Sequence, residues 1–196
     1  MSRPLIDMAL RRVREGAGTY TSGPSNQWVQ KIPDLRRWFA DVPFLVVGGL
    51  ATRLYMPERM TGDVDVLVAA DNLQRVEQEL EKYRARRIGP LSIGGSAWRL
   101  SDGRELDLIA TAAPWCTQAF REAREGPDGQ PYIDLPWLTL LKLESSRPQD
   151  LADLSRMLGN AGPALRDRIR EVVARYRPGD SEDIESLIKL GDLEKK

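Results

Sequence analysis

The chain has 196 residues, of which 41% are hydrophobic and 30% are charged, and its 29 basic residues balance its 29 acidic ones. This length and composition are typical of a soluble globular protein with one compact domain, with or without a helical extension. Because the chain has no histidine, Ser-His-Asp and Cys-His nucleophile pairs and HExxH zinc sites are excluded, and carboxylates or lysine must do any acid–base chemistry. The single Cys116 cannot form an internal disulfide, and we interpret it as a packing residue in a reducing compartment.

Hydropathy and charge restrict the partners of the chain. No apolar stretch approaches the ~20 residues that a membrane span needs, and the first residues do not resemble a secretory signal, so we expect a cytoplasmic protein with no membrane partner. The zero net charge argues against a general polycation. Residues 166–177 nevertheless contain five arginines against two acids, and residues 84–87 read RARR. We interpret the arginines of 166–177 as a solvated helix face. The alternative, for this segment and for 84–87, is a surface that binds RNA phosphates.

The first half of the chain has the pattern of an α/β core. Helices are expected at 5–15 and, interrupted by Pro33, at 27–42. A β-branched run at 44–49 ends in two glycines, residues 50–55 read as a short helix, and 63–70 alternate as a strand does. Strand, glycine turn, helix and strand in this order indicate a mixed α/β beginning.

The rest of the chain continues with one helix, several strands and then helices alone. Residues 70–84 predict a helix with Asp71 as its N-cap, and Asp102-Gly103 predicts a hairpin turn between antiparallel strands. The remaining strands are expected within 85–93, 96–110 and 131–135, and the helices at 136–146, 147–162, 163–177 and 180–191. The predicted fold class is therefore α+β, with an α/β core at 1–135 and a closely packed C-terminal helical lobe at 136–196.

Two carboxylates lie inside one of the predicted strands. Alternate side chains of a strand share a face and lie about 6.5 to 7 Å apart, so Asp63 and Asp65 project together while Val64 and Val66 face the other way. Burying two like charges side by side is costly, and a divalent cation is the simplest compensation. Mg²⁺ prefers carboxylate oxygens and commonly takes one or two of them together with substrate phosphates.

A third carboxylate and two glycines complete this candidate site. Asp107 lies between leucines in another predicted strand, which can bring it to the same metals, and Glu105 on the same face is a weaker candidate. Two metal ions held by three carboxylates would support in-line nucleotidyl or phosphoryl transfer from a nucleoside triphosphate (NTP). Because Gly48 and Gly49 have no side chains, their amides can approach phosphate oxygens closely near a helix N-terminus.

These residues resemble a known family. The chain has two glycines, then thirteen residues, then an Asp-x-Asp flanked by aliphatic residues. This pattern is similar to the signature of the polymerase-β nucleotidyltransferase superfamily, and Asp107 corresponds to the third carboxylate of that signature. The segment RMTGDVD narrows the resemblance to the AbiEii-like branch, which includes the MenT toxins of bacterial toxin–antitoxin systems. The residues that match its Arg-x-Thr-x-Asp-x-Asp pattern are Arg59, Thr61, Asp63 and Asp65.

A second block supports this resemblance. Lys142, Arg147, Asp150 and Asp153 are similar to the downstream motif of the same branch, although Gln149 replaces the lysine that often precedes the Asp-x-x-Asp. A lysine on a helix is suited to neutralising a β- or γ-phosphate, and an arginine can fork across phosphate oxygens. The two aspartates share a helix face, where they can orient these cations or accept the proton of an attacking hydroxyl.

The resemblance implies a polymerase-β-like mixed sheet with flanking helices and a Mg²⁺-dependent transfer of nucleotides from an NTP to the 3′ end of tRNA. It further implies a toxin that blocks aminoacylation and translation, with a cognate antitoxin as partner. The residues alone predict only metal-dependent transfer from an NTP, so nucleotidylation of a protein or of a small molecule such as an aminoglycoside, and a non-catalytic binding module, stay open. Phosphorylation of Thr61 would repel incoming phosphates, and mass spectrometry that always finds Thr61 unmodified beside the antitoxin would contradict this regulation.

Overall fold

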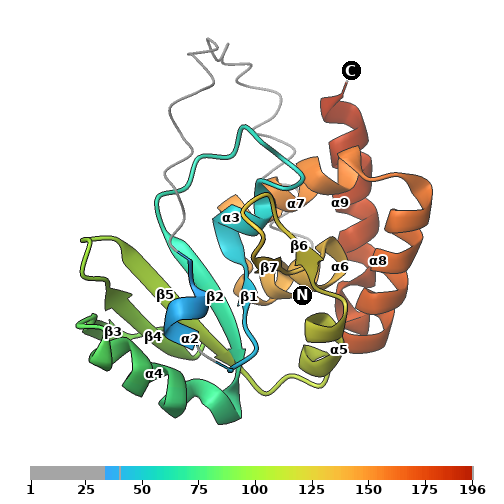
Figure 1. Cartoon of the computed structure of the whole chain (residues 1–196). Coiled ribbons are helices and arrows are strands. Elements are labelled where there is room, and N and C mark those ends of the chain that lie inside the picture. Colours follow the sequence, from blue (N-terminus) through green and yellow to red (C-terminus); the bar gives the residue numbers. More distant parts are fainter. Residues whose placement is uncertain (1–33, 40, 196) are drawn as a thin grey trace.

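The computed structural model describes residues 34–39 and 41–195, which form a mixed sheet and a group of helices packed beside it (Figure 1). The predicted helix at 5–15 and half of the one at 27–42 lie outside the described residues; within the described part of the second, the helix α2 (Arg36–Phe39) is present. No helix in the described part of the chain is both long and apolar enough to cross a membrane.

The sheet has seven strands in the order β3-β4-β5-β2-β1-β7-β6. The β2–β5 and β1–β7 pairs are parallel, and every other neighbouring pair is antiparallel. The strands are β1 (Leu45–Val46), β2 (Val64–Ala69), β3 (Arg86–Pro90), β4 (Gly95–Arg99), β5 (Glu105–Thr111), β6 (Arg124–Glu125) and β7 (Pro131–Tyr132). This mixed sheet with flanking helices confirms the predicted α+β fold class.

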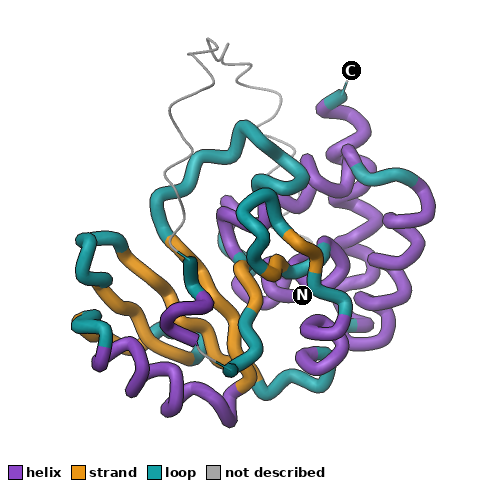
Figure 2. The backbone as a smooth tube through the Cα atoms, in the orientation of Figure 1, coloured by secondary structure: helices purple, strands orange, loops and turns teal. Residues whose placement is uncertain are grey.

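The helices occupy the connections and the C-terminal part of the chain, where Figure 2 shows α6 to α9 stacked beside the sheet. The short ones are α3 (Gly48–Thr52), η1 (Ala70–Asn72), α5 (Cys116–Arg121) and η2 (Pro178–Asp180). The longer ones are α4 (Leu73–Lys82), α6 (Leu135–Ser145), α7 (Pro148–Asn160), α8 (Pro163–Tyr176) and α9 (Ser181–Glu194). Proline in the first turn of α6, α7 and α8 fits their starts because the first amides of a helix have no intrahelical partner.

Two local predictions are corrected by the structure. Asp71 does not cap a helix, because it lies inside the 3₁₀ turn η1, and α4 begins after Asn72 without a side-chain cap. The strand expected at 131–135 is limited to β7, because Asp134 already precedes the first turn of α6. Both differences concern the boundaries of elements, where local propensity competes with tertiary packing.

Helix α4 covers one face of the β5 half of the sheet. Residues that alternate along β4 and β5 are buried beneath it, including Trp98, Leu106 and Leu108. Ser96 on the same face donates a hydrogen bond of 2.6 Å to Glu77 of α4 and accepts one of 2.8 Å from the Trp98 indole. The alternation of apolar and polar residues along β4 and β5 therefore corresponds to one sheet face that is buried against a helix.

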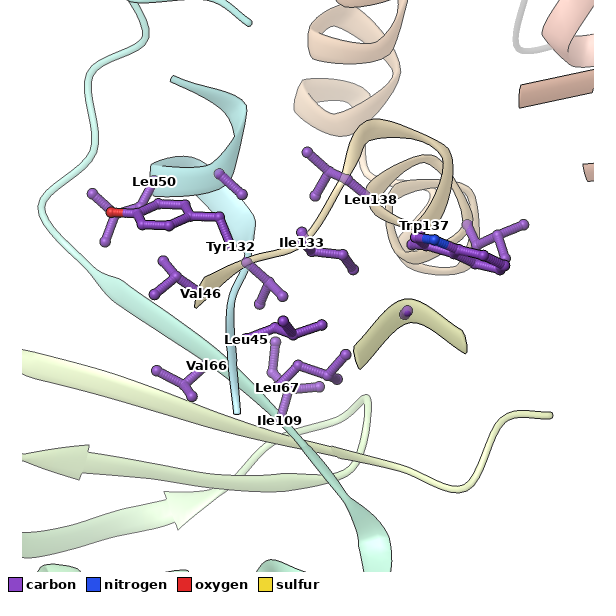
Figure 3. Packing of buried hydrophobic residues seen from close by; sticks show 14 of the residues in the cluster. Leu45, Val46, Leu50, Val66, Leu67, Ile109, Tyr132, Ile133, Trp137 and Leu138 are labelled. Atoms are coloured by element: carbon purple, nitrogen blue, oxygen red, sulfur yellow. The ribbon is translucent and has the colours of Figure 1, made fainter. Parts of the chain in front are cut away.

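The opposite face is covered only over part of its length. Figure 3 shows Leu67 of β2 and Ile109 of β5 beside Leu45, with Ile133 and then Leu138 of α6 farther along the same group of buried side chains. These residues belong to one hydrophobic cluster that continues from the sheet into the C-terminal helices. The C-terminal helices thus cover the ends of β2 and β5 that lie beyond the carboxylates.

The arginine-rich segment 166–177 is used inside the protein. In α8, Arg166 binds Asp192 at 2.6 Å, and Arg170 binds Glu185 at 2.5 Å. Arg168 pairs with Asp134 at 3.1 Å and also with Glu122, and Arg177 pairs with Asp180. The structure therefore favours intramolecular ion pairs over the alternative of an RNA-binding surface on this helix.

Candidate active site

Asp65 and Asp107 lie directly beside each other on the sheet. They are register partners on the adjacent parallel strands β2 and β5, so their side chains share a face and their Cα atoms are about 4.8 Å apart. Both are partly buried. Asp63, two residues before Asp65, precedes the first residue of β2 and is exposed, and Glu105 is exposed on β5.

The environment of these carboxylates penalises negative charge. Burial raises the pKa of Asp65 to about 6, the nearby Asp107 and Asp63 add to the rise, and a hydrogen bond from the Gly49 amide and the charge of Arg147 oppose it. Burial also raises the pKa of Asp107, with further contributions from Asp63 and Glu105. The site is therefore short of positive charge and favours a proton or a cation.

The two glycines of α3 make room for the site. A Cβ atom on Gly48, whose φ is +56°, would lie 1.9 Å from Oδ2 of Asp65, and one on Gly49 would lie 2.5 Å from Oγ1 of Thr61. The amide of Gly49 also donates a hydrogen bond of 3.3 Å to Asp65. The glycines are therefore required by the close approach of Asp65 and Thr61, and their contact with phosphate stays a prediction.

Lys142 lies in a buried ionic cluster. Its side chain is 5% exposed, and Nζ donates hydrogen bonds of 2.9 Å to both Asp150 and Asp153. Asp150 also accepts hydrogen bonds from Ser145 and, at 2.7 Å, from Nε of Arg147. Although burial alone would raise it, these bonds hold the pKa of Asp150 below its ordinary value. Lys142 thus neutralises two buried carboxylates, and its contact with a substrate phosphate stays a prediction.

Two arginines connect this cluster to the rest of the site. Arg147, between α6 and α7, is held by Asp150, and its charge lowers the pKa values of Asp65 and Asp107. Arg59 lies in the loop before β2 and binds Asp153 through Nε at 3.2 Å. Gln149 adds a hydrogen bond of 3.0 Å to Asp153. The downstream motif therefore fixes one arginine on each of two segments that border the carboxylates.

The pair of carboxylates of Asp65 and Asp107 could bind a divalent cation. Asp65 and Asp107 are two partly buried carboxylates with too little positive charge beside them, and Mg²⁺ commonly takes one or two protein carboxylates and completes its octahedron with water and phosphate oxygens. Among residues 34–39 and 41–195, no group of three or more Asp, Glu, Cys or His side chains is arranged to hold a metal ion. Asp63 lies directly before β2, outside the β2–β5 ladder, and its charge contributes to the raised pKa values of both Asp65 and Asp107, so its role as a third metal ligand stays a prediction.

Ala97 was not singled out from the sequence. It is the register partner of Asp107 on β4, so a small side chain adjoins the carboxylate pair on the side away from β2. An alanine in an alternating strand has no sequence signal of its own.

Solved structures similar to this one include ANT(2″)-Ia and CCA-adding enzymes. The crystal structure of ANT(2″)-Ia in complex with adenylyl-2″-tobramycin has a TM-score of 0.41 and 16% identity, over 80% of this chain and 91% of that chain. The Thermotoga maritima CCA-adding enzyme complexed with tRNA has a TM-score of 0.40 and 15% identity, over 72% of this chain and 41% of that chain. No family model matches the chain, and no curated protein sequence matches it. Both TM-scores are below 0.5, so these similarities carry no argument about the chemistry of the site.

We predict that Asp65→Asn stabilises the metal-free protein at neutral pH. Because the pKa of Asp65 is raised from 3.8 to about 6 in the folded state, the folded state binds more protons between these values, and its stability falls as pH rises through that window. Above it the substitution is expected to add on the order of 2–3 kcal/mol to the free energy of unfolding. Urea unfolding in EDTA at pH 4 and pH 7.5 measures this, with Asp71→Asn, at an exposed position in η1, as control. An equal effect at both pH values would contradict the prediction.

We predict that Lys142→Met destabilises the protein by about 3–5 kcal/mol, because it leaves two buried carboxylates without their cation. Denaturant unfolding measures the loss. Lys82→Met is the control, since Lys82 is 67% exposed and pairs only with Glu79, so its removal should cost less than about 1 kcal/mol. Adding Asp150→Asn and Asp153→Asn to Lys142→Met should restore part of the stability, and no recovery would count against an electrostatic cause.

Proposed function

We propose that this chain is a Mg²⁺-dependent nucleotidyltransferase that adds nucleotides from an NTP to the 3′ end of tRNA. In this proposal the product can no longer be aminoacylated, translation stops, and the chain is the toxin of a bacterial toxin–antitoxin system with a cognate antitoxin. The sequence resemblance to the AbiEii-like branch supports the acceptor and the biological role. The site itself supports the kind of reaction.

One observation carries the proposed chemistry. Asp65 and Asp107 are side by side on parallel strands, partly buried, with the closely packed Gly48-Gly49 turn on one side and the charge of Arg147 near both. A purely structural role does not account for this arrangement, because it places repelling carboxylates together at a cost in stability. Paired carboxylates next to an arginine suit the binding of a cation and a polyphosphate together.

Each residue then has a defined task. Asp65 and Asp107 would hold Mg²⁺, which supplies neutralisation of charge on the phosphates and on the attacking oxygen. Arg147 is held by Asp150 and is 73% exposed, so its remaining guanidinium donors can bind triphosphate oxygens. Arg59, held by Asp153, borders the site from the loop before β2. In the transfer, the acceptor hydroxyl bonds to the α-phosphorus, the bond to the β-phosphate oxygen breaks, and pyrophosphate leaves with that oxygen.

The acid–base assignment follows from the surroundings of each carboxylate. Asp150 and Asp153 are buried and bound to Lys142, so they have no access to an attacking hydroxyl, and we assign them to positioning the arginines. Asp107 is partly exposed and has no salt-bridge partner among the described residues, which makes it the better-placed acceptor for the hydroxyl proton.

We predict that Asp65→Asn abolishes transfer of label from an α-labelled NTP to tRNA, with a loss of at least about 100-fold, because the amide removes charge at the point where the phosphate charge is neutralised. The measurement is a gel assay of purified protein with total RNA and each labelled NTP in turn. Asp71→Asn, at an exposed position in η1, is the control and should keep wild-type activity. If the wild-type protein labels a protein or an aminoglycoside and leaves tRNA unlabelled, the proposed tRNA acceptor is wrong. If Asp65→Asn transfers as much label as the wild-type protein, the proposed active site is wrong.

A further inference from the structure

The face of the sheet that carries the carboxylates continues beyond them as a strip of small residues. Asp107 pairs with Ala97 on β4, and Ala97 pairs with Gly89 on the edge strand β3. Register partners share a face, so Asp65, Asp107, Ala97 and Gly89 form one row across four strands. Neighbouring strands are about 4.8 Å apart, so this row continues for roughly 10 Å from Asp107 to the edge of the sheet with no side chain larger than a methyl group.

This part of the face is accessible. Along β4 and β5 the residues on the α4 side are buried, whereas Ala97, Arg99, Glu105 and Asp107 are partly or fully exposed. Helix α4 lies on the opposite side of these strands, and Figure 1 shows the C-terminal helices grouped beyond β1 and β7. Among the described residues the carboxylates therefore lie at the boundary between a covered and an uncovered half of one face.

A bulge brings basic side chains to the uncovered half. The register of β3 shifts between Arg87 and Gly89, so both Gly89 and Arg86 pair with residues on the carboxylate face, Arg86 with Arg99. Without the extra residue these two positions of β3, three apart, would lie on opposite faces. Arg87 faces the other way and lies 3.6 Å from Glu77 of α4. The RARR run is thus divided between the two faces.

The two arginines on this face are available for a ligand. Arg86 is exposed and has no ion-pair partner in the described ranges. Arg99 is 57% exposed and pairs with Glu105, which is 49% exposed, at 2.5 Å. An ion pair this exposed contributes about 0–1 kcal/mol, so a phosphate can replace Glu105 at little cost.

The position of Arg147 decides which substrate uses this strip. Arg147 and the α6–α7 junction lie beside the carboxylates and, in the proposed function, bind the triphosphate. Phosphoryl transfer requires the attacking oxygen and the leaving oxygen to lie roughly in line on opposite sides of the phosphorus. The acceptor hydroxyl must therefore approach from another side than the pyrophosphate, and the uncovered strip over Ala97 and Gly89 offers that approach.

We propose that the acceptor is a single-stranded polynucleotide end that lies across Ala97 and Gly89, with its phosphates bound by Arg86 and Arg99. This inference rests on the proposed function and assigns the acceptor path to residues outside both sequence motifs. The small row allows a backbone to lie close to the sheet, and the arginines match the charge of phosphates that follow the reacting end. A cationic acceptor such as an aminoglycoside would be repelled by the same two side chains.

The test compares Arg86→Ala/Arg99→Ala with a matched control, Arg75→Ala. Arg75 is 55% exposed and pairs with Asp41, much as Arg99 pairs with Glu105, but it lies on α4 across the sheet. The probe is a short fluorescein-labelled single-stranded RNA with a free 3′ hydroxyl, and anisotropy at several KCl concentrations gives Kd. Removing two phosphate contacts should lower the slope of log K against log salt by about 1.4, which corresponds to a loss on the order of 25-fold at 0.1 M salt.

Kinetics with the same variants separate this inference from the proposed function. The double variant should raise the KM for RNA while the KM for NTP stays within about twofold of the wild-type value, because the arginines touch only the acceptor. Unchanged Kd and KM for RNA in the double variant, or the same loss in Arg75→Ala, would overturn the acceptor path. A higher KM for an aminoglycoside acceptor in the double variant would overturn it as well, because these arginines should repel such an acceptor rather than bind it. Wild-type protein that transfers no nucleotide to any acceptor would instead contradict the proposed function.

Discussion

The repulsion between Asp65 and Asp107 is the constraint around which this site is built. Parallel pairing of β2 with β5 fixes the two carboxylates at neighbouring positions on one face, and partial burial denies them the screening of bulk water. The Gly48-Gly49 turn contributes one amide hydrogen bond to Asp65, and Arg147 contributes a charge. These compensations are incomplete, as the raised pKa values show, and a bound divalent cation would supply the positive charge that is still missing.

The buried cluster around Lys142 explains how the arginines are kept in place. An exposed arginine loses much conformational entropy when it is fixed. A site that needs an arginine in a defined position must therefore hold its guanidinium group through ion pairs. Asp150 holds Arg147 and Asp153 holds Arg59. Lys142 offsets the electrostatic cost of burying both aspartates, because it pairs with each of them. The motif therefore connects the α6–α7 junction to the loop before β2, two segments that are far apart in the sequence.

The sequence predicted the parts of this site that depend on residue type and local period. Alternating aliphatic and acidic residues indicated that Asp65 and Asp107 share a strand environment, and the structure aligns them. The mixed sheet and the C-terminal helices were also predicted. The burial of Lys142 and the division of the RARR run were not, because they depend on which elements pack together. A register shift of one residue in β3 decides the face of Arg86, and no local pattern in that segment indicates it.

The same sheet face has opposite character on the two sides of the carboxylates, and this asymmetry follows from where the C-terminal helices pack. Leu67 and Ile109, two residues beyond Asp65 and Asp107, are buried in the hydrophobic cluster that continues into α6, whereas Ala97 on the next strand stays accessible. Helix α6 also carries Lys142, so the element that covers one side of the face supplies the cluster that holds Arg147. The packing of the C-terminal helices therefore covers one side of this row and leaves the other side open, and the proposed two-substrate reaction would use that division.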